Sequence, residues 1–228
     1  METLADVVAS LDDPDRPAVR AERTHDAREF RSRVYKTGNA LRHRGVRESA
    51  GVAVLDVPAM PALHTCFGAA LLGGVVEFGP DRVVDARVLA GPTTELDAYD
   101  LPRGGQRVGW GAPPADPSWL YFERDVWSEN PTFPEPEVAA DTPFLGGATH
   151  GEVLAAAVEV ADGYDGDDEV AVRAPLSHPG TVVAGVVAPL VAGATVVVPP
   201  AGGAGTVAVT AGDDAPEDRV VSPDDAHP

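Results

Sequence analysis

Residues 167–200 read DDEVAVRAPLSHPGTVVAGVVAPLVAGATVVVPP. The apolar run at 169–173 predicts a buried strand, and the Pro-rich turn at 175–180 follows it. Small residues at 181–191 predict a helix that Gly193 ends, and 195–198 predicts a second apolar strand. Continuous apolar strands joined through a helix indicate a parallel strand–helix–strand crossover, buried on both faces of its sheet.

The charge balance of the chain is strongly acidic. Its 228 residues include 36 acidic and 17 basic side chains, for a net charge of −19, and Lys36 is the only lysine. Because 44% of the residues are hydrophobic, the composition predicts a folded protein and not a disordered acidic tail. A surface this rich in carboxylates favours adaptation to high salt, with an ordinary acidic protein as the alternative. It argues against binding to nucleic acid or anionic membranes, since no basic patch is present.

Cys66 is the only cysteine, so no disulfide can form within the chain, and its apolar neighbours predict a core residue more readily than a catalytic thiol. The first ten residues lack the charged and apolar segments of a secretion signal and lead into Asp12, Asp13 and Asp15. The longest apolar run is interrupted by Gly and Pro and does not resemble a membrane span. We therefore expect a soluble, cytoplasmic protein.

Periodicity along the chain predicts an α/β fold with a mostly parallel sheet and flanking helices. Helices are expected at 24–44 (with Thr24 as N-cap), 61–72, 149–161 and 181–191. Strands are expected near 52–56, 75–78, 86–89, 107–109, 142–145, 169–173, 195–198 and 206–210. The predicted organisation is a single domain over 1–210, with possible sub-lobes 1–125 and 126–210, and an acidic flexible tail over 211–228. The predicted core residues are Leu41, Val54, Leu71, Val76, Leu154, Val172, Val186, Leu190 and Val197.

Several segments resemble one family when they are read in order. They are NALRHRGV (39–46) with GVAVL (51–55), FGAALLGGVV (67–76), THGEVL (149–154), and PLSH (175–178) with PLVAGAT (189–195). Together they resemble the N-terminal part of the acyl-CoA synthetase, or AMP-binding, superfamily of adenylate-forming enzymes. The resemblance implies the α/β fold of that part, and it covers about 180 of the 228 residues.

The same resemblance implies a phosphate-binding loop just before Thr149, and the chain departs from the family there. A Ser/Thr/Gly-rich loop ending in Pro-Lys-Gly holds the triphosphate in the family, whereas residues 141–148 read DTPFLGGA. Gly146 and Gly147 predict a tight turn from a strand ending at Leu145 to a helix beginning at Thr149. The later nucleotide, metal and lysine motifs have no counterpart, so we expect no catalytic residue, no metal and no cofactor.

Four residues are weak candidates for ligand binding: Gly146, Gly147, Thr149 and His178. Thr149 and Glu152 also form the pattern of a capping box, which explains both without chemistry. His178 matches a position near the acyl pocket of the family, and the alternative is a turn histidine bonded to local backbone.

Three other features favour structural interpretations. The acidic loop of Asp162, Asp165, Asp167 and Asp168 lacks calcium-loop spacing and predicts a solvated turn. The glycines of 202–205 predict a flexible turn. Aromatic residues are concentrated in the middle segment and are expected to anchor it, or to mark a partner surface where exposed: Trp110, Trp119, Tyr121, Phe122 and Trp127.

Three hypotheses follow for function. The first is a non-catalytic acyl-CoA synthetase-like domain, either a binding or regulatory module for a small acyl or CoA-type ligand or a remnant. The second is a subunit that completes a split ligase with a complementary chain. The third is an unrelated nucleotide-binding α/β protein, which rests only on the general pattern of strands, helices and Gly-rich turns.

Overall fold

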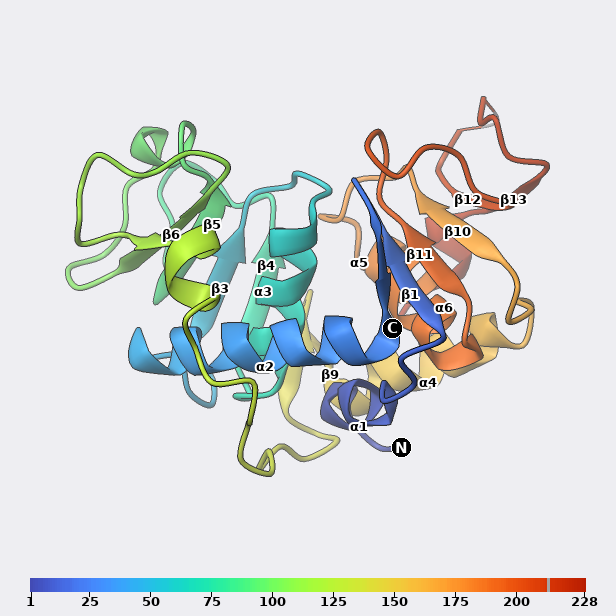
Figure 1. The fold of residues 1–228 in the computed structure, drawn as a ribbon, viewed down its shortest axis with the longest axis horizontal. Helices are drawn as coiled ribbons and strands as arrows, with labels where there is room; N and C mark the ends of the chain where they lie inside the picture. The colour runs from blue at the N-terminus through green and yellow to red at the C-terminus, as the bar shows by residue number, and fades with distance from the viewer. Residues whose placement is uncertain (213) are drawn as a thin grey trace.

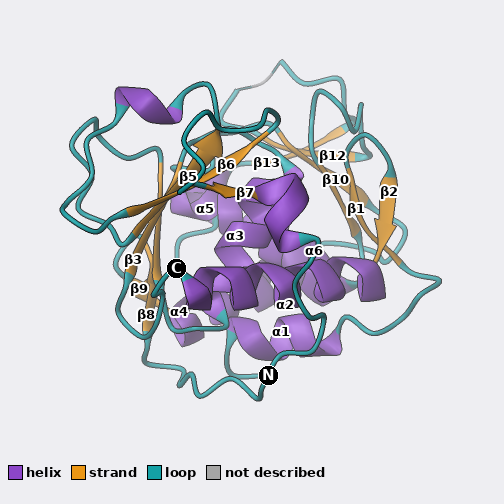
Figure 2. Ribbon diagram, turned by 60° about the vertical axis from the view of Figure 1, so that its left-hand side comes forward, coloured by secondary structure: helices purple, strands orange, loops and turns teal. Residues whose placement is uncertain are grey.

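The computed structural model describes residues 1–212 and 214–228, and its strands form two sheets with helices between them (Figure 1, Figure 2). The predicted α/β class with mostly parallel pairing is confirmed. The strands are nevertheless divided between two sheets, where a single sheet was expected. Each sheet draws strands from both sides of residue 125.

The first sheet has the order β13-β12-β10-β11-β1-β2. Its strands are β1 (Pro17–Arg20), β2 (Thr24–Asp26), β10 (Glu169–Val172), β11 (Thr195–Val197), β12 (Val207–Val209) and β13 (Arg219–Val221). All neighbours are parallel except β1 and β2.

The second sheet has the order β7-β6-β5-β3-β4-β8-β9. Its strands are β3 (Gly51–Val54), β4 (Val75–Phe78), β5 (Val88–Pro92), β6 (Gln106–Trp110), β7 (Leu120–Tyr121), β8 (Pro143–Leu145) and β9 (Ala148–Thr149). The β8–β9 pair alone is antiparallel among these described strands.

The helices between the sheets are α1 (Leu4–Ser10), α2 (Ala27–His43), α3 (Met60–Ala70), α4 (His150–Ala161), α5 (Pro179–Val182) and α6 (Ala188–Ala192). A π-helical turn, η3 (Val183–Val187), joins α5 to α6, and a second one, η2 (Phe122–Val126), packs beside α2. The short 3-10 turns are η1 (Leu96–Ala98) and η4 (Pro223–Asp225). No helix in the described ranges is both long enough and apolar enough to cross a membrane.

The crossover predicted from residues 167–200 is confirmed. Strands β10 and β11 are adjacent and parallel, with Val170 opposite Val196. The helical segment begins at Pro179, two residues before the predicted start, because proline suits the first helical position. It ends at Gly193, whose φ of 84° lies in the left-handed region that glycine tolerates.

The predicted start of the first long helix at Thr24 is wrong. Residues Thr24–Asp26 form β2 against β1, and Asp26 is the N-cap of α2. The Asp26 carboxylate accepts the Glu29 N–H at 2.7 Å. Aspartate, like threonine, is a favoured N-cap, so propensity alone does not choose between the two; the pairing of β2 with β1 does.

All nine predicted core residues are buried, each with less than 5% exposure. Alternation along the strands of the second sheet explains how both of its faces are covered. Val52 and Val54 face the main core among the helices, while Ala53 and Leu55 face a smaller cluster that includes Leu96 of η1. The Cys66 thiol belongs to the main core, and burial raises its pKa to about 12, as expected for a structural cysteine.

The expected flexible tail contains an ordered strand, and the acidic loop is not fully solvated. β13 pairs with β12, and Arg219 at its start forms an ion pair with Asp168 at 2.8 Å. Asp168 is buried and also accepts a hydrogen bond from the Thr206 hydroxyl at 2.9 Å. Composition alone did not reveal these partners, because they lie 38 and 51 residues away along the chain.

Candidate functional site

A cavity of about 380 Å³ lies where β8 stops short beside β4. Leu145, the last residue of β8, pairs with Val76, while β4 continues to Phe78. The lining residues come from β4, the end of β8 and the turn that follows it, the turn after β10 and the start of α5: Val75, Val76, Glu77, Phe78, Leu145, Gly146, Gly147, Leu176, Ser177 and Pro179. Loops at the carboxyl ends of parallel strands are the usual place for ligands in α/β folds.

The turn over Gly146 and Gly147 forms one wall of this cavity. Both residues have positive φ, 58° and 90°, as the two central positions of a two-residue hairpin turn require. Gly146 also lies against Pro179, since a Cβ on it would be 2.8 Å from the proline ring. The predicted three-residue connection between Leu145 and Thr149 is therefore present, with Ala148 paired in β9.

The N-terminus of α4 follows this turn, and its first N–H groups are already occupied. The N–H of His150 donates to the Thr142 carbonyl at 2.9 Å, and that of Gly151 to the Ala140 carbonyl at 2.7 Å. The N–H of Glu152 donates to Thr149 Oγ1 at 3.2 Å. Each group that could hold an anion at a helix N-terminus thus has a protein acceptor.

Thr149 closes the predicted capping box. The Glu152 carboxylate accepts the Thr149 N–H at 2.8 Å and its hydroxyl at 2.9 Å. These hydrogen bonds, led by the backbone one, lower the pKa of Glu152. The Thr149 side chain is therefore bound within its own helix.

The neighbouring His150 is fully buried and connects α4 to α1. Its Nδ1 accepts the Leu4 N–H at 3.3 Å, and its ring packs on Phe144 at a centroid distance of 4.9 Å. Burial lowers the pKa of His150 to about 4, so the ring is neutral near pH 7. The α1 helix that uses this contact was not predicted, since its seven residues carry only a short apolar pattern.

The turn after β10 is held by Asp56, a residue that the sequence analysis missed. Asp56 follows β3, and its carboxylate accepts the N–H groups of Leu176 at 2.8 Å and Ser177 at 3.1 Å. Gly79, directly after β4, packs against Ser177 from the same side. Asp56 is the last residue of the strand predicted at 52–56, and an aspartate at the carboxyl end of a buried strand was the available signal, because such residues reach the edge where neighbouring loops meet.

His178 is not among the residues that line the cavity. Its Nε2 lies 3.0 Å from Asp224 Oδ1, and its ring lies 5.9 Å from that of His227. The close approach of Gly180 to the Pro223 carbonyl belongs to the same contact between α5 and the C-terminal segment. The structure thus brings Gly146 and Gly147 to the cavity, leaves Thr149 in its cap, and orients His178 toward the end of the chain.

The chemistry of the lining is mostly apolar. Glu77 is its one charged residue and Ser177 its one hydroxyl, and no arginine or lysine is present. No group of three His, Cys, Asp or Glu side chains suited to a metal ion occurs within residues 1–212 and 214–228. Phosphate chains need cations or free N–H groups, so this arrangement suits a small apolar group and not a triphosphate.

No family model and no curated protein sequence matches the chain. Solved structures do match its fold. An anthranilate CoA ligase, AuaEII, determined with anthranoyl-AMP, has a TM-score of 0.76 at 18% identity, over 91% of this chain and 49% of the ligase. A benzoate CoA ligase from Burkholderia xenovorans LB400 has a TM-score of 0.69 at 17% identity, over 91% and 50%.

A nonribosomal peptide synthetase, FmoA3, determined with α-methyl-L-serine-AMP, matches with a TM-score of 0.71 at 22% identity, over 87% of this chain and 24% of that one. The chain spans about half or less of the length of these three structures. The resemblance inferred from the segments at 39–55, 67–76, 149–154 and 175–195 is thus confirmed at the level of fold.

Proposed function

We propose that this chain is a non-catalytic domain with the adenylate-forming fold, which binds a small acyl or CoA-type ligand through the apolar cavity beside β4. The observation that supports the non-catalytic assignment is that the N–H groups at the N-terminus of α4 are already occupied. Its first three N–H groups are bound by Thr142, Ala140 and Thr149, and the two-glycine turn before it supplies neither hydroxyls nor a cation. An ATP phosphate chain would have no donors there.

A direct test is adenylate formation by the purified chain in high KCl. We expect no ATP–pyrophosphate exchange with benzoate, acetate or fatty acids. In thermal-shift titrations we expect ATP and AMP to leave the melting temperature unchanged up to millimolar concentration, while a CoA thioester raises it. Exchange activity above that of a mock preparation would overturn the non-catalytic assignment.

Two variants locate the binding of the thioester. Ser177→Trp places a bulky ring at the cavity and should abolish the shift caused by the thioester, because Ser177 lines it. His178→Ala should leave that shift unchanged, because its ring contacts Asp224 and is not part of the lining. Loss of the shift in His178→Ala alone would instead place the ligand against the histidine.

The second candidate function is a subunit that completes a split ligase with another chain. It is favoured by the coverage of the matched structures, of which this chain spans between 24% and 50% in the three cases compared. The test is co-purification of the tagged chain from cells of its own source, followed by the same exchange assay on the complex. A partner with adenylating activity only in the complex would support this candidate over the first. For either candidate function, we propose that the protein acts in the cytoplasm.

A further inference from the structure

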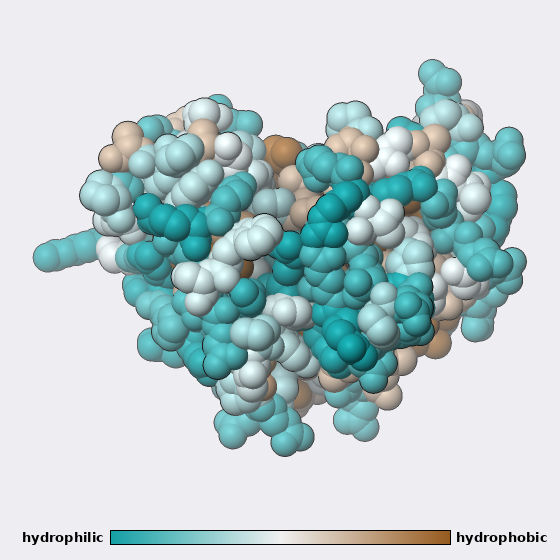
Figure 3. All heavy atoms as spheres, in the orientation of Figure 1, coloured by the Kyte–Doolittle hydropathy of each residue, from teal (hydrophilic) through white to brown (hydrophobic). Residues whose placement is uncertain are grey.

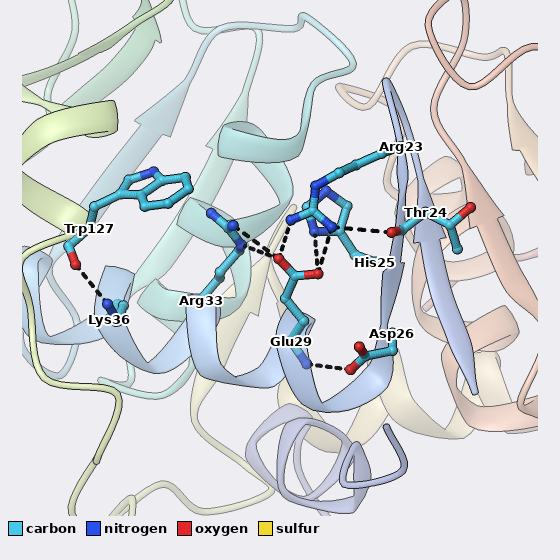
Figure 4. A network of polar contacts seen from close by, with 8 residues as sticks. All are labelled: Arg23, Thr24, His25, Asp26, Glu29, Arg33, Lys36 and Trp127. Carbon is cyan, nitrogen blue, oxygen red and sulfur yellow. Dashed lines mark hydrogen bonds and ion pairs between the residues drawn. The ribbon is translucent and has the colours of Figure 1, made fainter. Parts of the chain in front are cut away.

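A second cavity, of about 390 Å³, lies beside α2. Its lining comes from the first half of α2, from η2 with the following Trp127, and from Pro14. We call it the α2 groove, and it is lined by Pro14, Asp26, Arg28, Glu29, Ser32, Arg33, Lys36, Phe122, Val126 and Trp127. Figure 3 shows that the face on which α2 lies is mostly hydrophilic, and Figure 4 shows the polar side chains along α2.

Helical spacing places three of the cations of α2 in this groove: Arg28, Arg33 and Lys36. Arg28, Ser32 and Lys36 follow one another at intervals of four, so they share a face of the helix, and Glu29 and Arg33 form the adjoining row. The lining therefore contains three cationic side chains and two carboxylates. This is a local positive surplus in a chain of net charge −19, and it contains the only lysine.

The two carboxylates of the lining are already bound. Glu29 accepts hydrogen bonds from Arg23 at 2.7 Å and from Arg33 at 3.0 and 3.1 Å (Figure 4). These contacts, led by Arg23, lower the pKa of Glu29 to about 2, so it stays ionised. Asp26 is committed to the N-cap of α2. Neither carboxylate is therefore available to Lys36.

Lys36 forms no ion pair with any described residue. Its ammonium donates to the Trp127 carbonyl at 2.7 Å, which leaves further N–H donors directed to the groove. The Arg33 guanidinium lies over the Trp127 indole, 4.4 Å from its centroid, and pairs with Glu29 through Nε and one terminal nitrogen. Two half-buried cations, one turn apart, thus lie beside one aromatic ring.

The lining beside these cations is apolar. Phe122 and Val126 are buried at its base, and Trp127 is 56% exposed. An exposed indole next to a concave surface is typical of a binding site. Arg33 already lies over one part of the indole, and the lining as a whole carries one more cation than carboxylates, so it favours a negatively charged ligand.

We infer that the α2 groove binds a small aromatic anion, with its flat ring against Phe122, Val126 and Trp127 and its charged group bound by Lys36 and Arg33. The volume of the groove lies within the range of small-molecule sites, about 300 to 1,000 Å³. This site is separate from the cavity beside β4, with which it shares no lining residue.

The test uses 2-naphthoate as probe and 2-naphthalenemethanol as its uncharged analogue, each titrated by calorimetry. We expect naphthoate to bind at least about tenfold more tightly than the alcohol, because a charge-assisted hydrogen bond contributes about a factor of ten or more. Lys36→Gln and Trp127→Ala should each weaken naphthoate binding by about tenfold or more, whereas Lys36→Arg should retain it.

Two controls make the outcome decisive. Arg103→Gln removes an exposed cation that is not part of the groove lining and should leave the affinity unchanged. Ser177→Trp should also leave it unchanged, which separates this site from the cavity beside β4 even if the proposed function fails. Circular dichroism and melting curves confirm that each variant is folded. Equal affinity for the acid and the alcohol, unchanged affinity in both Lys36→Gln and Trp127→Ala, or no binding at millimolar probe would overturn the inference.

Discussion

His64 shows at the residue scale how burial replaces hydrogen bonding as the dominant influence on a side chain. Its ring stacks on Phe122 at 6.0 Å and contacts Phe30 at 5.2 Å, and neither ring nitrogen has a hydrogen-bond partner among the described residues. Burial lowers the pKa of His64 to about 3. The ring is therefore neutral in the folded protein at every pH near neutrality.

This gives a prediction for the pH dependence of stability. In the unfolded chain His64 takes up a proton below about pH 6.5, whereas in the folded protein it does so only near pH 3. The unfolded state therefore binds more protons between these values, and acid lowers the free energy of unfolding by about 1.4 kcal/mol per pH unit. In urea denaturation at pH 6.5 and pH 5, His64→Leu should lose about 1.6 kcal/mol less stability than the wild type, because the unfolded histidine is already half protonated at pH 6.5. An identical loss in both proteins would contradict the neutral, buried ring.

At the scale of elements, the last strand depends on ion pairs that reach across the first sheet. Glu217 precedes β13, and its carboxylate, which is not exposed, accepts two hydrogen bonds from Arg173 after β10, at 2.5 and 2.7 Å. It also accepts the Gly205 N–H at 3.0 Å. The Glu217 carboxylate thus connects the glycine turn after β11 to the segment that precedes β13.

We therefore expect Glu217→Gln to destabilise the protein and loosen β13. The loss of a buried, charge-assisted pair should lower the free energy of unfolding by about 2 kcal/mol. In the variant Arg173 stays partly buried, so water cannot fully replace the lost carboxylate. Chemical denaturation measures this change, and limited proteolysis should cut the chain beyond residue 210 more quickly. Glu135→Gln, at an exposed carboxylate without an ion pair among the described residues, is the matched control. Equal behaviour of the two variants would mean that β13 does not depend on this pair.

Across the whole molecule, the dominant electrostatic feature is the net charge of −19. The ion pairs of the structure use only part of the 36 acidic side chains, so most carboxylates repel one another at the surface. Such repulsion acts against the compact state, and it is weakened when salt shortens the screening length.

The melting temperature should accordingly rise as KCl increases from 0.1 M to 1 M, where the Debye length falls from about 10 Å to about 3 Å. Differential scanning calorimetry over this range measures the effect. An equal concentration of a neutral osmolyte separates screening from the general exclusion of cosolutes. A melting temperature that is constant or falls with KCl would count against the proposed adaptation to high salt.

The sequence by itself determined those elements that are specified by residues close together in the chain. The crossover of β10 and β11, the Gly193 stop, the two-glycine turn and the Thr149–Glu152 cap are each specified within a few residues, and all are present. The buried apolar positions were predictable for the same reason, because periodicity shows which side chains must leave water.

Tertiary structure decided what depends on residues distant in the chain. The three-residue strands β2 and β13 have too few residues for a periodic pattern, and they form because β1 and β12 offer unpaired edges. The division into two sheets, the Asp56 contact to Leu176, the orientation of His178 toward Asp224 and the α2 groove likewise join segments far apart. Such contacts depend on the closure of long loops and the burial of shared surface, which no local pattern records.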